Sequence, residues 1–375
     1  MKFRIDRDAL ADAVAWTARS LPQRPPVPVL AGMHIEVTDR LKLSAFDYEV
    51  SAQVTTDVDV EEPGTALVSG RLLAEISRSL PPQPVEVTTD GAKVMLRCGS
   101  ARFTLLTMPV EDYPSLPEMP PAAGSVGSDE FAAAVSQVAI AAGKDDTIPM
   151  LTGVRVEIEG ETVTLASTDR YRLAVRELHW NPERPDFTAT ALVPAKTLAD
   201  TAKSLTHGAE VSIALGGTDG IGEGMIGFSG GGRRTTSRLL DGDFVKYRSL
   251  LPNEYAGLAE VQTGPFIEAV KRVSLVAERN TPVRLSFRQG EVVLEAGTGD
   301  EAQAVEALEA SLEGEDIDIA FNPSFLLDGL SAISSDVARL SFTTPTKPAV
   351  LTGKPPEDGA NPNYRYLIMP VRLSG

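Results

Sequence analysis

The sequence predicts an α+β protein built from three tandem modules, each with two helices packed on antiparallel sheets. Three observations predict this fold: a repeated strand-to-helix segment, a repeated amphipathic helix ahead of it, and alternating strand pairs between the two helices. The chain has 375 residues. That length accommodates three modules of about 125 residues, and each is large enough to bury a core.

The first repeated feature is a short apolar strand that runs into an amphipathic helix. It occurs in three segments, 67–73, 192–198 and 320–326. Ser69, Pro194 and Asn322 stand at the expected helix starts, where these residue types are favoured.

A second amphipathic helix begins each module. Its buried positions follow the i, i+4, i+7 spacing of one helix face. The three sets are Leu10, Val14 and Thr17; Phe131, Val135 and Val138; and Phe266, Val270 and Val273. Together the two repeated features predict six helical segments, at 7–20, 69–80, 128–144, 194–207, 264–279 and 322–334.

Period-two alternation between these helices predicts antiparallel strand pairs. The pairs are expected near 33–37 and 41–43, near 154–158 and 163–165, and near 283–287 and 292–294. Stretches rich in Pro and Gly, at 116–127 and 252–264, are predicted linkers. The expected domains are therefore 1–120, 125–253 and 254–375.

The net charge is -17, which argues against an ordinary nucleic-acid binder with a basic footprint. However, the six helical segments together carry a net charge of +1, so the acidic residues lie in strands and loops. On charge alone, the favoured interpretation is solvated helix faces without a partner. An acidic outer surface and a near-neutral helical surface would also suit a protein that surrounds DNA.

Several classes of site are not supported by the sequence. Cys98 is the only cysteine, which leaves no intrachain disulfide and no thiolate zinc site. His34, His179 and His207 are scattered, so no metal cluster is expected. No apolar run is long enough for a membrane span and no signal region is visible, so we expect a cytoplasmic protein without membrane partners or cofactors.

Two glycine-rich motifs resemble enzyme signatures. Gly222–Gly227 fits G-x-G-x-x-G and Gly227–Gly231 fits G-x-S-x-G, but both signatures require a helix directly afterwards. Gly230-Gly231-Gly232 follows instead, and every histidine precedes Ser229. We therefore interpret the segment as a β-hairpin and expect no catalysis.

Stretches along nearly the whole chain resemble the bacterial DNA polymerase III β subunit family, the replicative sliding clamps. They are Met1-Lys2-Phe3, Arg24-Pro25 with Pro28-Val29-Leu30, Thr168–Ala174, Val193–Lys196, Leu240-Asp241-Gly242 with Tyr247, and Tyr366–Leu373. The resemblance implies three DNA-clamp domains per chain and a head-to-tail homodimer that forms a ring. It implies a non-enzymatic, nucleoid-associated processivity factor that slides on double-stranded DNA without sequence preference and is placed there by an ATP-dependent clamp loader.

The resemblance also implies an apolar cleft for short linear motifs of the polymerase α subunit, the clamp loader, other polymerases and repair proteins. The residues expected to line it are Leu151, Thr168, Tyr171, Arg172, Leu173, Val245, Leu250, Thr346, Met369, Pro370, Val371 and Arg372. Arg172 and Arg372 are expected to pair with acidic or polar motif residues. Val245 and Ser249 replace a usual proline and arginine, and Ser374-Gly375 extend the usual terminus, which leaves motif preference open.

Two further surfaces follow from the resemblance and from helix position. The expected DNA-facing residues are Arg24, Arg71, Arg78, Lys196, Lys203, Lys271 and Arg272. The expected dimer interface pairs Phe103 and Leu105 with the helix end around Leu275, although a core position is an equal alternative for these residues. The second hypothesis for the whole chain is a peptide-binding scaffold that never encircles DNA, and the third is a hydrolase centred on Ser229.

Overall fold

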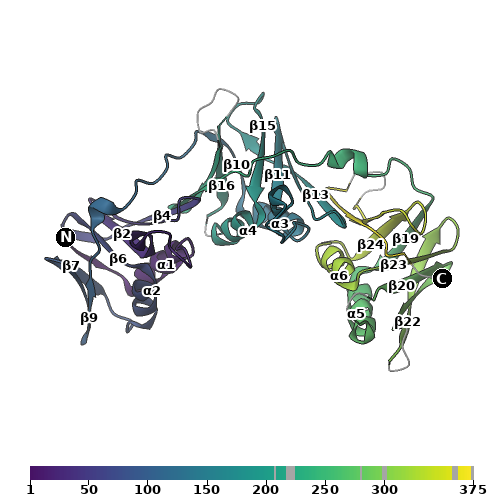
Figure 1. Cartoon of the computed structure of the whole chain (residues 1–375), viewed down its shortest axis with the longest axis horizontal. Coiled ribbons are helices and arrows are strands. Elements are labelled where there is room, and N and C mark those ends of the chain that lie inside the picture. Colours follow the sequence, from purple (N-terminus) through teal and green to yellow (C-terminus); the bar gives the residue numbers. More distant parts are fainter. Residues whose placement is uncertain (207, 217–223, 279–280, 298–301, 357–361, 373–375) are drawn as a thin grey trace. The chain divides into compact units, whose positions relative to one another are not determined.

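In the computed structural model the chain forms two compact parts. Figure 1 shows their helices and strands. The structure describes all residues except 207, 217–223, 279–280, 298–301, 357–361 and 373–375. The first part comprises 1–131, 180–189 and 200–239, and the second comprises 132–179, 190–199 and 240–375. Both parts contain antiparallel sheets with helices packed on them, so the predicted α+β class is confirmed.

Each of the six predicted helical segments contains an α-helix. They are α1 (Arg7–Ala18), α2 (Gly70–Ser79), α3 (Ser128–Ala139), α4 (Ala195–Ser204), α5 (Thr263–Val273) and α6 (Pro323–Ser331). The predicted buried faces are confirmed, because Val14, Phe266 and Val270 each have 0% of their surface exposed. The predicted C-terminal ends are late by one to six residues, and at α5 the chain continues as a tighter turn. After Val273, residues Ser274–Val276 form a 3-10 turn, as helix ends often do.

Side chains fix the starts of three helices. The Asp6 carboxylate accepts hydrogen bonds from the backbone N–H groups of Asp8 and Ala9 at the start of α1. Ser69 and Asn322 accept in the same way at the starts of α2 and α6. Such caps satisfy N–H groups that have no partner within the helix.

The first part contains two antiparallel sheets, a five-stranded sheet of order β5-β1-β7-β8-β9 and a nine-stranded sheet of order β14-β10-β16-β17-β18-β4-β3-β2-β6. The strands of the first are β1 (Lys2–Ile5), β5 (Asp59–Glu62), β7 (Val85–Asp90), β8 (Lys93–Cys98) and β9 (Ala101–Leu106). The strands of the second are β2 (Gly32–Val37), β3 (Leu41–Phe46), β4 (Val50–Thr56), β6 (Gly64–Ser69), β10 (Ala122–Gly127), β14 (Asn181–Pro182), β16 (Glu210–Leu215), β17 (Met225–Gly230) and β18 (Arg233–Arg238).

The second part contains one twelve-stranded sheet of order β15-β11-β12-β13-β26-β25-β24-β19-β22-β21-β20-β23. Its strands are β11 (Gly153–Glu159), β12 (Thr162–Thr168), β13 (Arg172–His179), β15 (Thr188–Pro194), β19 (Gly257–Gln262), β20 (Val283–Arg288), β21 (Gly290–Ala296), β22 (Ala304–Glu313), β23 (Ile317–Phe321), β24 (Val337–Phe342), β25 (Ala349–Gly353) and β26 (Tyr364–Ile368). The predicted strand pairs are confirmed as β2–β3, β11–β12 and β20–β21.

Both predicted linkers are too long. β10 lies within 116–127 and β19 lies within 252–264. Each is the first strand of a module, at the place that β1 has in the first. Glycine in Ala122–Gly127 and at Gly257 concealed these strands, because it is a residue that weakens strand predictions.

One antiparallel strand pair joins successive modules within each part. β4 of the first module pairs with β18, the last strand of the second, and β13 of the second pairs with β26, the last strand of the third. We call the pair β4–β18 the first junction and the pair β13–β26 the second junction. β4, β13 and β22 are equivalent, because each is the third strand of its module's hairpin run.

Candidate partner cleft and DNA-facing surface

A tight turn between β12 and β13 places an aromatic side chain on the surface. The Asp169 carboxylate accepts hydrogen bonds from the backbone N–H groups of Tyr171 (3.0 Å) and Arg172 (3.1 Å). Arg170 adopts a φ of 80°, which is uncommon for a residue with a side chain. The result is that Tyr171 is 59% exposed, while the residues that follow it enter the sheet.

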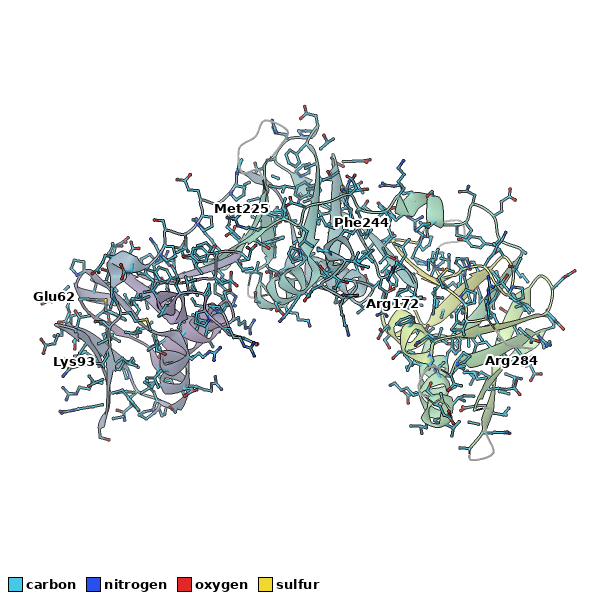
Figure 2. The ribbon with its side chains drawn as sticks, viewed as in Figure 1. Glu62, Lys93, Arg172, Met225, Phe244 and Arg284 are labelled. Carbon is cyan, nitrogen blue, oxygen red and sulfur yellow. The ribbon has the colours of Figure 1, made fainter. Side chains whose placement is uncertain are left out.

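An apolar cluster lies beside this turn. It consists of the buried residues Ala166, Leu173, Val175, Tyr247, Val350 and Leu367, against which Phe244, Val245 and Leu251 pack while partly exposed. The segment from Phe244 (labelled in Figure 2) to Leu251 therefore covers four adjacent strands, β12, β13, β26 and β25. Leu250 of the same segment is 49% exposed.

The C-terminal segment runs along the same turn. The backbone N–H of Met369 donates to the Tyr171 carbonyl (2.8 Å), and the N–H of Val371 donates to the Ala320 carbonyl (2.8 Å). The Met369 side chain is 39% exposed. Tyr171, Val245 and Met369 thus come from three distant stretches of sequence to one partly open surface, above the buried Leu173.

The other predicted cleft residues are placed differently. Leu151 is 7% exposed in a 3-10 turn (Pro149–Thr152), and Thr168 is 4% exposed with its hydroxyl donating to the Arg172 carbonyl (2.6 Å). Both residues therefore support the turn from within the protein and offer little surface to a partner. Thr346 and Arg372 are exposed, and Pro370 and Val371 are half-buried. Leu373, Ser374 and Gly375 lie outside the described residues.

Arg172 (labelled in Figure 2) has a structural role that the sequence did not indicate. Its Nε lies 3.0 Å from Asp169 Oδ2 and its Nη1 lies 2.5 Å from Asp328 Oδ2. Nη1 also donates to the Tyr366 hydroxyl (3.3 Å), and the guanidinium stands 4.3 Å from the centre of the Phe325 ring. With 6% of the residue exposed, Arg172 is occupied within the chain, so the expected pairing with a partner motif does not fit this geometry.

The surroundings keep Arg172 charged. Burial lowers the pKa of its guanidinium, but hydrogen bonds and charges from Tyr366, Asp328 and Asp169 outweigh burial and raise that pKa above its ordinary value. Burial also raises the pKa of the Tyr366 hydroxyl, which therefore stays protonated and donates to the Phe325 carbonyl at 2.8 Å.

Glu157 anchors the segment that covers the apolar cluster. The Tyr247 hydroxyl donates to Glu157 Oε2 (2.8 Å), and Arg248 Nη1 lies 2.6 Å from the same oxygen. Burial raises the pKa of the Glu157 carboxyl, but these two partners outweigh it and the pKa lies below its usual value. The anchor is therefore charged at neutral pH.

The first junction has the same turn as the second, but it lacks apolar residues at the equivalent strand positions. Asp47 accepts from the N–H groups of Glu49 (2.9 Å) and Val50 (2.6 Å), and Tyr48 there has a φ of 74°. The position of the paired Leu173 and Leu367 is taken by Ser51 and Thr236, whose hydroxyls lie 2.5 Å apart. This pair of equivalent positions is therefore apolar at the second junction and polar at the first.

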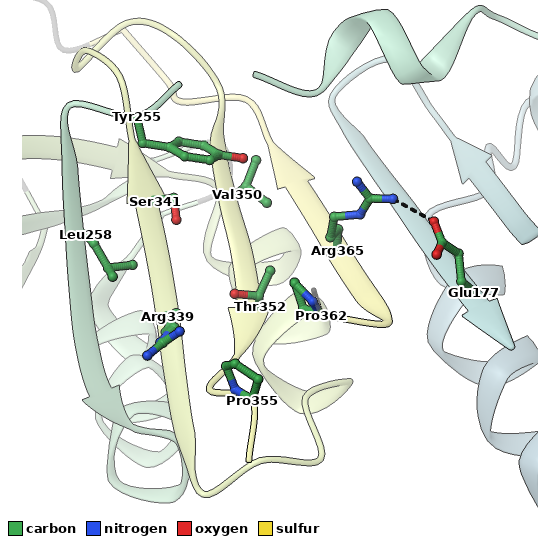
Figure 3. Close-up of a pocket in the computed structure, with 10 residues that line it drawn as sticks. All are labelled: Glu177, Tyr255, Leu258, Arg339, Ser341, Val350, Thr352, Pro355, Pro362 and Arg365. Carbon is green, nitrogen blue, oxygen red and sulfur yellow. Dashed lines mark hydrogen bonds and ion pairs between the residues drawn. The ribbon is translucent and has the colours of Figure 1, made fainter. Parts of the chain in front are cut away.

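A second cavity lies farther along the second junction (Figure 3). It has a volume of about 380 Å³ and includes Glu177, Tyr255, Arg339 and Arg365 in its lining. The Arg365 guanidinium lies 3.0 Å from the Glu177 carboxylate across the junction, as the dashed line in Figure 3 shows. Its lining mixes charged and apolar side chains, and Val350 belongs also to the apolar cluster.

The seven predicted DNA-facing cations fall into two groups. Lys271 pairs with Glu268 (2.8 Å) and Arg272 pairs with Glu306 (2.5 Å). Five others are exposed and form no ion pair with a described residue: Arg24, Arg71, Arg78, Lys196 and Lys203. Arg71 donates to the carbonyls of Pro22 and Gln23, which brings it beside Arg24.

The predicted dimer residues differ in exposure. Leu275 is 85% exposed, but Leu105 is 2% exposed and Phe103 is half-buried. Successive residues of a strand face opposite sides, so Leu106, at 73% exposed, presents the apolar surface of β9 instead of Leu105. Leu105 is therefore a core residue, the alternative that the sequence left open for it.

Neither enzyme motif has a helix behind it. β17 and β18 form an antiparallel hairpin in which Ser229 pairs with Arg234, which confirms the predicted hairpin from Met225 onward; Gly222 and Glu223 lie outside the described residues. The described residues contain no group of three or more His, Cys, Asp or Glu side chains that could hold a metal ion. None of the helices described is long and apolar enough to cross a membrane.

Comparison with known proteins matches every module to one family. Three family profiles described as DNA polymerase III beta subunit match the chain: the N-terminal domain over residues 1–117, the central domain over 125–246 and the C-terminal domain over 248–372. The beta sliding clamp of Streptomyces coelicolor is 66% identical, with 100% of both chains covered. The beta sliding clamp of Bacillus subtilis is 29% identical, with 99% of this chain and 100% of that protein covered.

Solved structures agree. The Bacillus subtilis DNA polymerase sliding clamp superimposes with a TM-score of 0.92 at 28% identity, and the Pseudomonas aeruginosa sliding clamp bound to griselimycin with a TM-score of 0.91 at 28% identity; both cover 100% of either chain. The fold and these matches define a clamp protein of three tandem domains. The chain belongs to the DNA polymerase III β subunit family, whose members are the non-catalytic processivity factors of replicative DNA polymerase.

Proposed function

We propose that two copies of this chain close head to tail into a ring that encircles duplex DNA and tethers replicative polymerase to it. The observation that carries the proposal is the repeated junction. β4 of the first module pairs with the last strand of the second module, and β13 of the second module pairs with the last strand of the third. Within one chain this leaves β22, the equivalent strand of the third module, and β9, the last strand of the first module. We propose that β22 of one copy pairs with β9 of the other.

The edges of these two strands support that pairing. β9 is the last strand of its sheet. β22 pairs with β21 along residues 304–310 and with β19 only at 310–313, so its outer edge is open at its start. Open strand edges are templates for pairing with another chain.

Exposed apolar side chains lie at both edges. Leu106 ends β9 and is 73% exposed, while Val305 of β22 is 66% exposed. The ion pair between Arg272 and Glu306 ties the end of α5 to β22, which brings Leu275 to the same edge. Three modules per chain give six in a closed dimer. We propose 1–120, 125–253 and 254–375 as their bounds.

Charge supports a DNA-facing helical surface. Arg24, Arg71, Arg78, Lys196 and Lys203 lie on or beside α1, α2 and α4 without an acidic partner among the described residues, whereas the chain as a whole carries -17. Phosphate contacts of this kind carry no sequence information. We propose that these five contribute more than Lys271 and Arg272, whose charges are already compensated.

The apolar surface at the second junction supports partner binding. We propose that Tyr171, Leu173, Val245, Leu250, Met369, Pro370 and Val371 receive short linear motifs from the polymerase α subunit, the clamp loader, other polymerases and repair proteins. Leu151, Thr168 and Arg172 would frame this cleft, and Thr346 and Arg372 would lie at its rim. An apolar floor with adaptable Met and Leu side chains suits several related peptides.

We propose in addition that an ATP-dependent clamp loader places the ring on DNA. The chain itself would carry no catalytic site and no cofactor, and it would reside in the cytoplasm at the nucleoid. The test is topological. The chain, loaded onto nicked circular DNA by a clamp loader with ATP, should stay bound in high salt and be released when that DNA is cut once. Equal retention on circular and linear DNA would exclude encirclement and favour the alternative, a peptide-binding scaffold.

A further inference from the structure

A basic pocket in the first part of the chain has no role in the function proposed above. Residues of β3, β4, β17, β18 and the adjoining turns line an open pocket of about 490 Å³, among them Arg40, Lys42, Gln53, Thr55, Ser229 and Arg234. The pocket therefore lies at the first junction. Four cationic residues line it, Arg40, Lys42, Arg233 and Arg234, on a chain whose net charge is -17. Arg233 is paired with Asp12 of α1.

Strand alternation places this pocket on the face opposite to α1. Leu43 and Val54 are buried on the side where α1 packs, whereas the neighbouring Lys42 and Thr55 are half-exposed. Arg233 reaches Asp12 of α1 at 2.6 Å, so the next residue, Arg234, points to the opposite face. α1 contacts β3 and β4 on their other face.

The second junction has a carboxylate beside its arginine, and the first junction does not. Arg365 of β26 and Arg234 of β18 hold equivalent positions in their junction strands, opposite Val175 and Gln53 respectively. Two residues after Val175 stands Glu177, which pairs with Arg365 at 3.0 Å (Figure 3).

Two residues after Gln53, the equivalent of Glu177 is Thr55, which carries no charge. Arg234 is exposed and forms no ion pair with any described residue. The repeat thus places an arginine at both junctions but a neutralising carboxylate at only one.

The other two cations have exchangeable partners. Lys42 pairs with Glu36 at 3.2 Å and Arg40 pairs with Asp57 at 2.7 Å, and the Asp57 side chain is 89% exposed. Exposed ion pairs contribute only about 0–1 kcal/mol. A carboxylate from another molecule can therefore replace these partners at little cost, and the hydroxyls of Thr55 and Ser229 can donate to it as well.

We propose that this pocket binds an acidic segment, rich in Asp and Glu, of a partner protein. Its volume lies within the range of pockets that enclose small ligands, and it suits a few carboxylates held by Arg234, Lys42 and Arg40. A short acidic segment confines its charge to the pocket. A nucleic acid would extend its negative charge over the rest of a strongly acidic surface, which repels it. The surface differs from the apolar cleft in position and in chemistry.

The test uses the full-length protein and a fluorescein-labelled octapeptide of alternating Asp and Glu, followed by fluorescence anisotropy. A peptide of alternating Asn and Gln is the neutral control. The acidic peptide should bind, should weaken with added salt, and should lose about fivefold or more in affinity in Arg234→Ala. Arg234→Lys should retain most of the affinity.

Arg365→Ala is the matched control, because it removes the equivalent arginine where Glu177 already neutralises it, and it should leave the acidic peptide's affinity unchanged. Unchanged thermal unfolding of Arg234→Ala shows that the loss is local. Equal binding of the two peptides, or equal affinity of Arg234→Ala and the parent chain, overturns the proposal. A short single-stranded oligonucleotide or inorganic phosphate that displaces the peptide more effectively than unlabelled peptide also overturns it, since the pocket would then be a nucleic-acid or phosphate site.

Discussion

Arg172 of β13 and Asp328 of α6 form an ion pair of 2.5 Å that joins the second module to the third. The guanidinium lies at the same time over the ring of Phe325, also in α6. A charged side chain this deeply buried is stable only with its partners in place. The second junction therefore depends on this side chain as well as on its strand pair.

The first junction has a similar device. Arg233 of β18 lies 2.6 Å from Asp12 of α1, and its guanidinium stands 5.5 Å from the Trp16 ring. Its Nη1 also donates to the Ser204 carbonyl at the end of α4 (2.9 Å). At both junctions a buried arginine of the middle module holds a helix of its neighbour through an aspartate and an aromatic ring.

Replacing Arg172 with Ala should destabilise the second part by about 3 kcal/mol, because Asp169 and Asp328 lose their counter-charge and several hydrogen bonds disappear. Arg172→Lys should restore only part of this, since an ammonium cannot satisfy both carboxylates in the planar geometry of a guanidinium. Urea unfolding followed by circular dichroism measures the change. Lys246→Ala, at an exposed position, is the control, and equal stability of Arg172→Ala and that control would contradict the assignment.

The repeat and the six helices could be predicted because residues close together in the sequence determine them. Apolar spacing such as that of Phe266 and Val270 marks a helix face, and Ser69 or Asn322 marks its start. Strands β10 and β19 were missed for the opposite reason. Their glycines weaken the local signal for a strand, and the pairing that forms them is with distant strands.

The candidate cleft could be predicted in part. Tyr171 and Met369 follow from the motifs in which they stand. The role of Arg172 could not be predicted, because it depends on Asp328, which lies 156 residues away. Leu106 was within reach of the sequence: alternation along β9 puts it on the face opposite to Leu105.

Tyr171→Ala and Met369→Ala should each weaken binding of a short apolar linear-motif peptide by roughly fivefold to tenfold, because each removes about 1 kcal/mol or more of partly exposed apolar contact. Isothermal titration calorimetry measures the affinity. Tyr48→Ala is the matched control, since Tyr48 occupies the equivalent turn at the first junction and is 43% exposed. If Tyr48→Ala weakens binding as much as Tyr171→Ala does, the peptide is not bound at the second junction.

Removing residues 369–375 should abolish peptide binding while the dimer persists. The deletion takes away the exposed Met369 and the backbone hydrogen bonds from Met369 and Val371, but leaves β26 intact. Calorimetry and light scattering on the same sample separate the two properties. Unchanged affinity of the truncated chain would refute the place of the cleft.

Leu275→Arg should convert the dimer into a monomer, because a charge on an 85% exposed apolar residue would have to be buried without a partner. Leu106→Arg should act in the same way at the opposite edge. Light scattering should then give a mass near that of the single 39.9 kDa chain instead of twice that value. Leu105→Ala is the contrasting variant: it should lower the unfolding midpoint and leave the dimer in place, and the reverse pattern would restore Leu105 to the interface.

Lys196→Ala with Lys203→Ala should reduce the salt dependence of DNA binding, lowering the slope of log K against log salt by about 2 in magnitude if both side chains neutralise phosphates. Lys271→Ala with Arg272→Ala should change the slope less, because Glu268 and Glu306 already compensate those charges. Anisotropy of labelled duplex DNA across a salt series measures both slopes. A larger change from the second pair would place the DNA on the third module's helices instead.

The stack of His34 on Tyr113, with ring centres 5.7 Å apart, should make stability depend on pH. Burial lowers the pKa of the His34 imidazole below its ordinary value; Glu36 opposes this and Lys42 adds to it. The folded chain therefore binds this proton less readily than the unfolded chain. Stability from this residue is complete above about pH 6.5 and is lost as the pH falls through that value toward the folded pKa.

His34→Phe keeps the stack without the titration, so its denaturation midpoint should fall less between about pH 7.5 and pH 5. His179→Gln, at a position 70% exposed, should retain the parent chain's dependence, and an identical dependence in His34→Phe would show that other groups cause it.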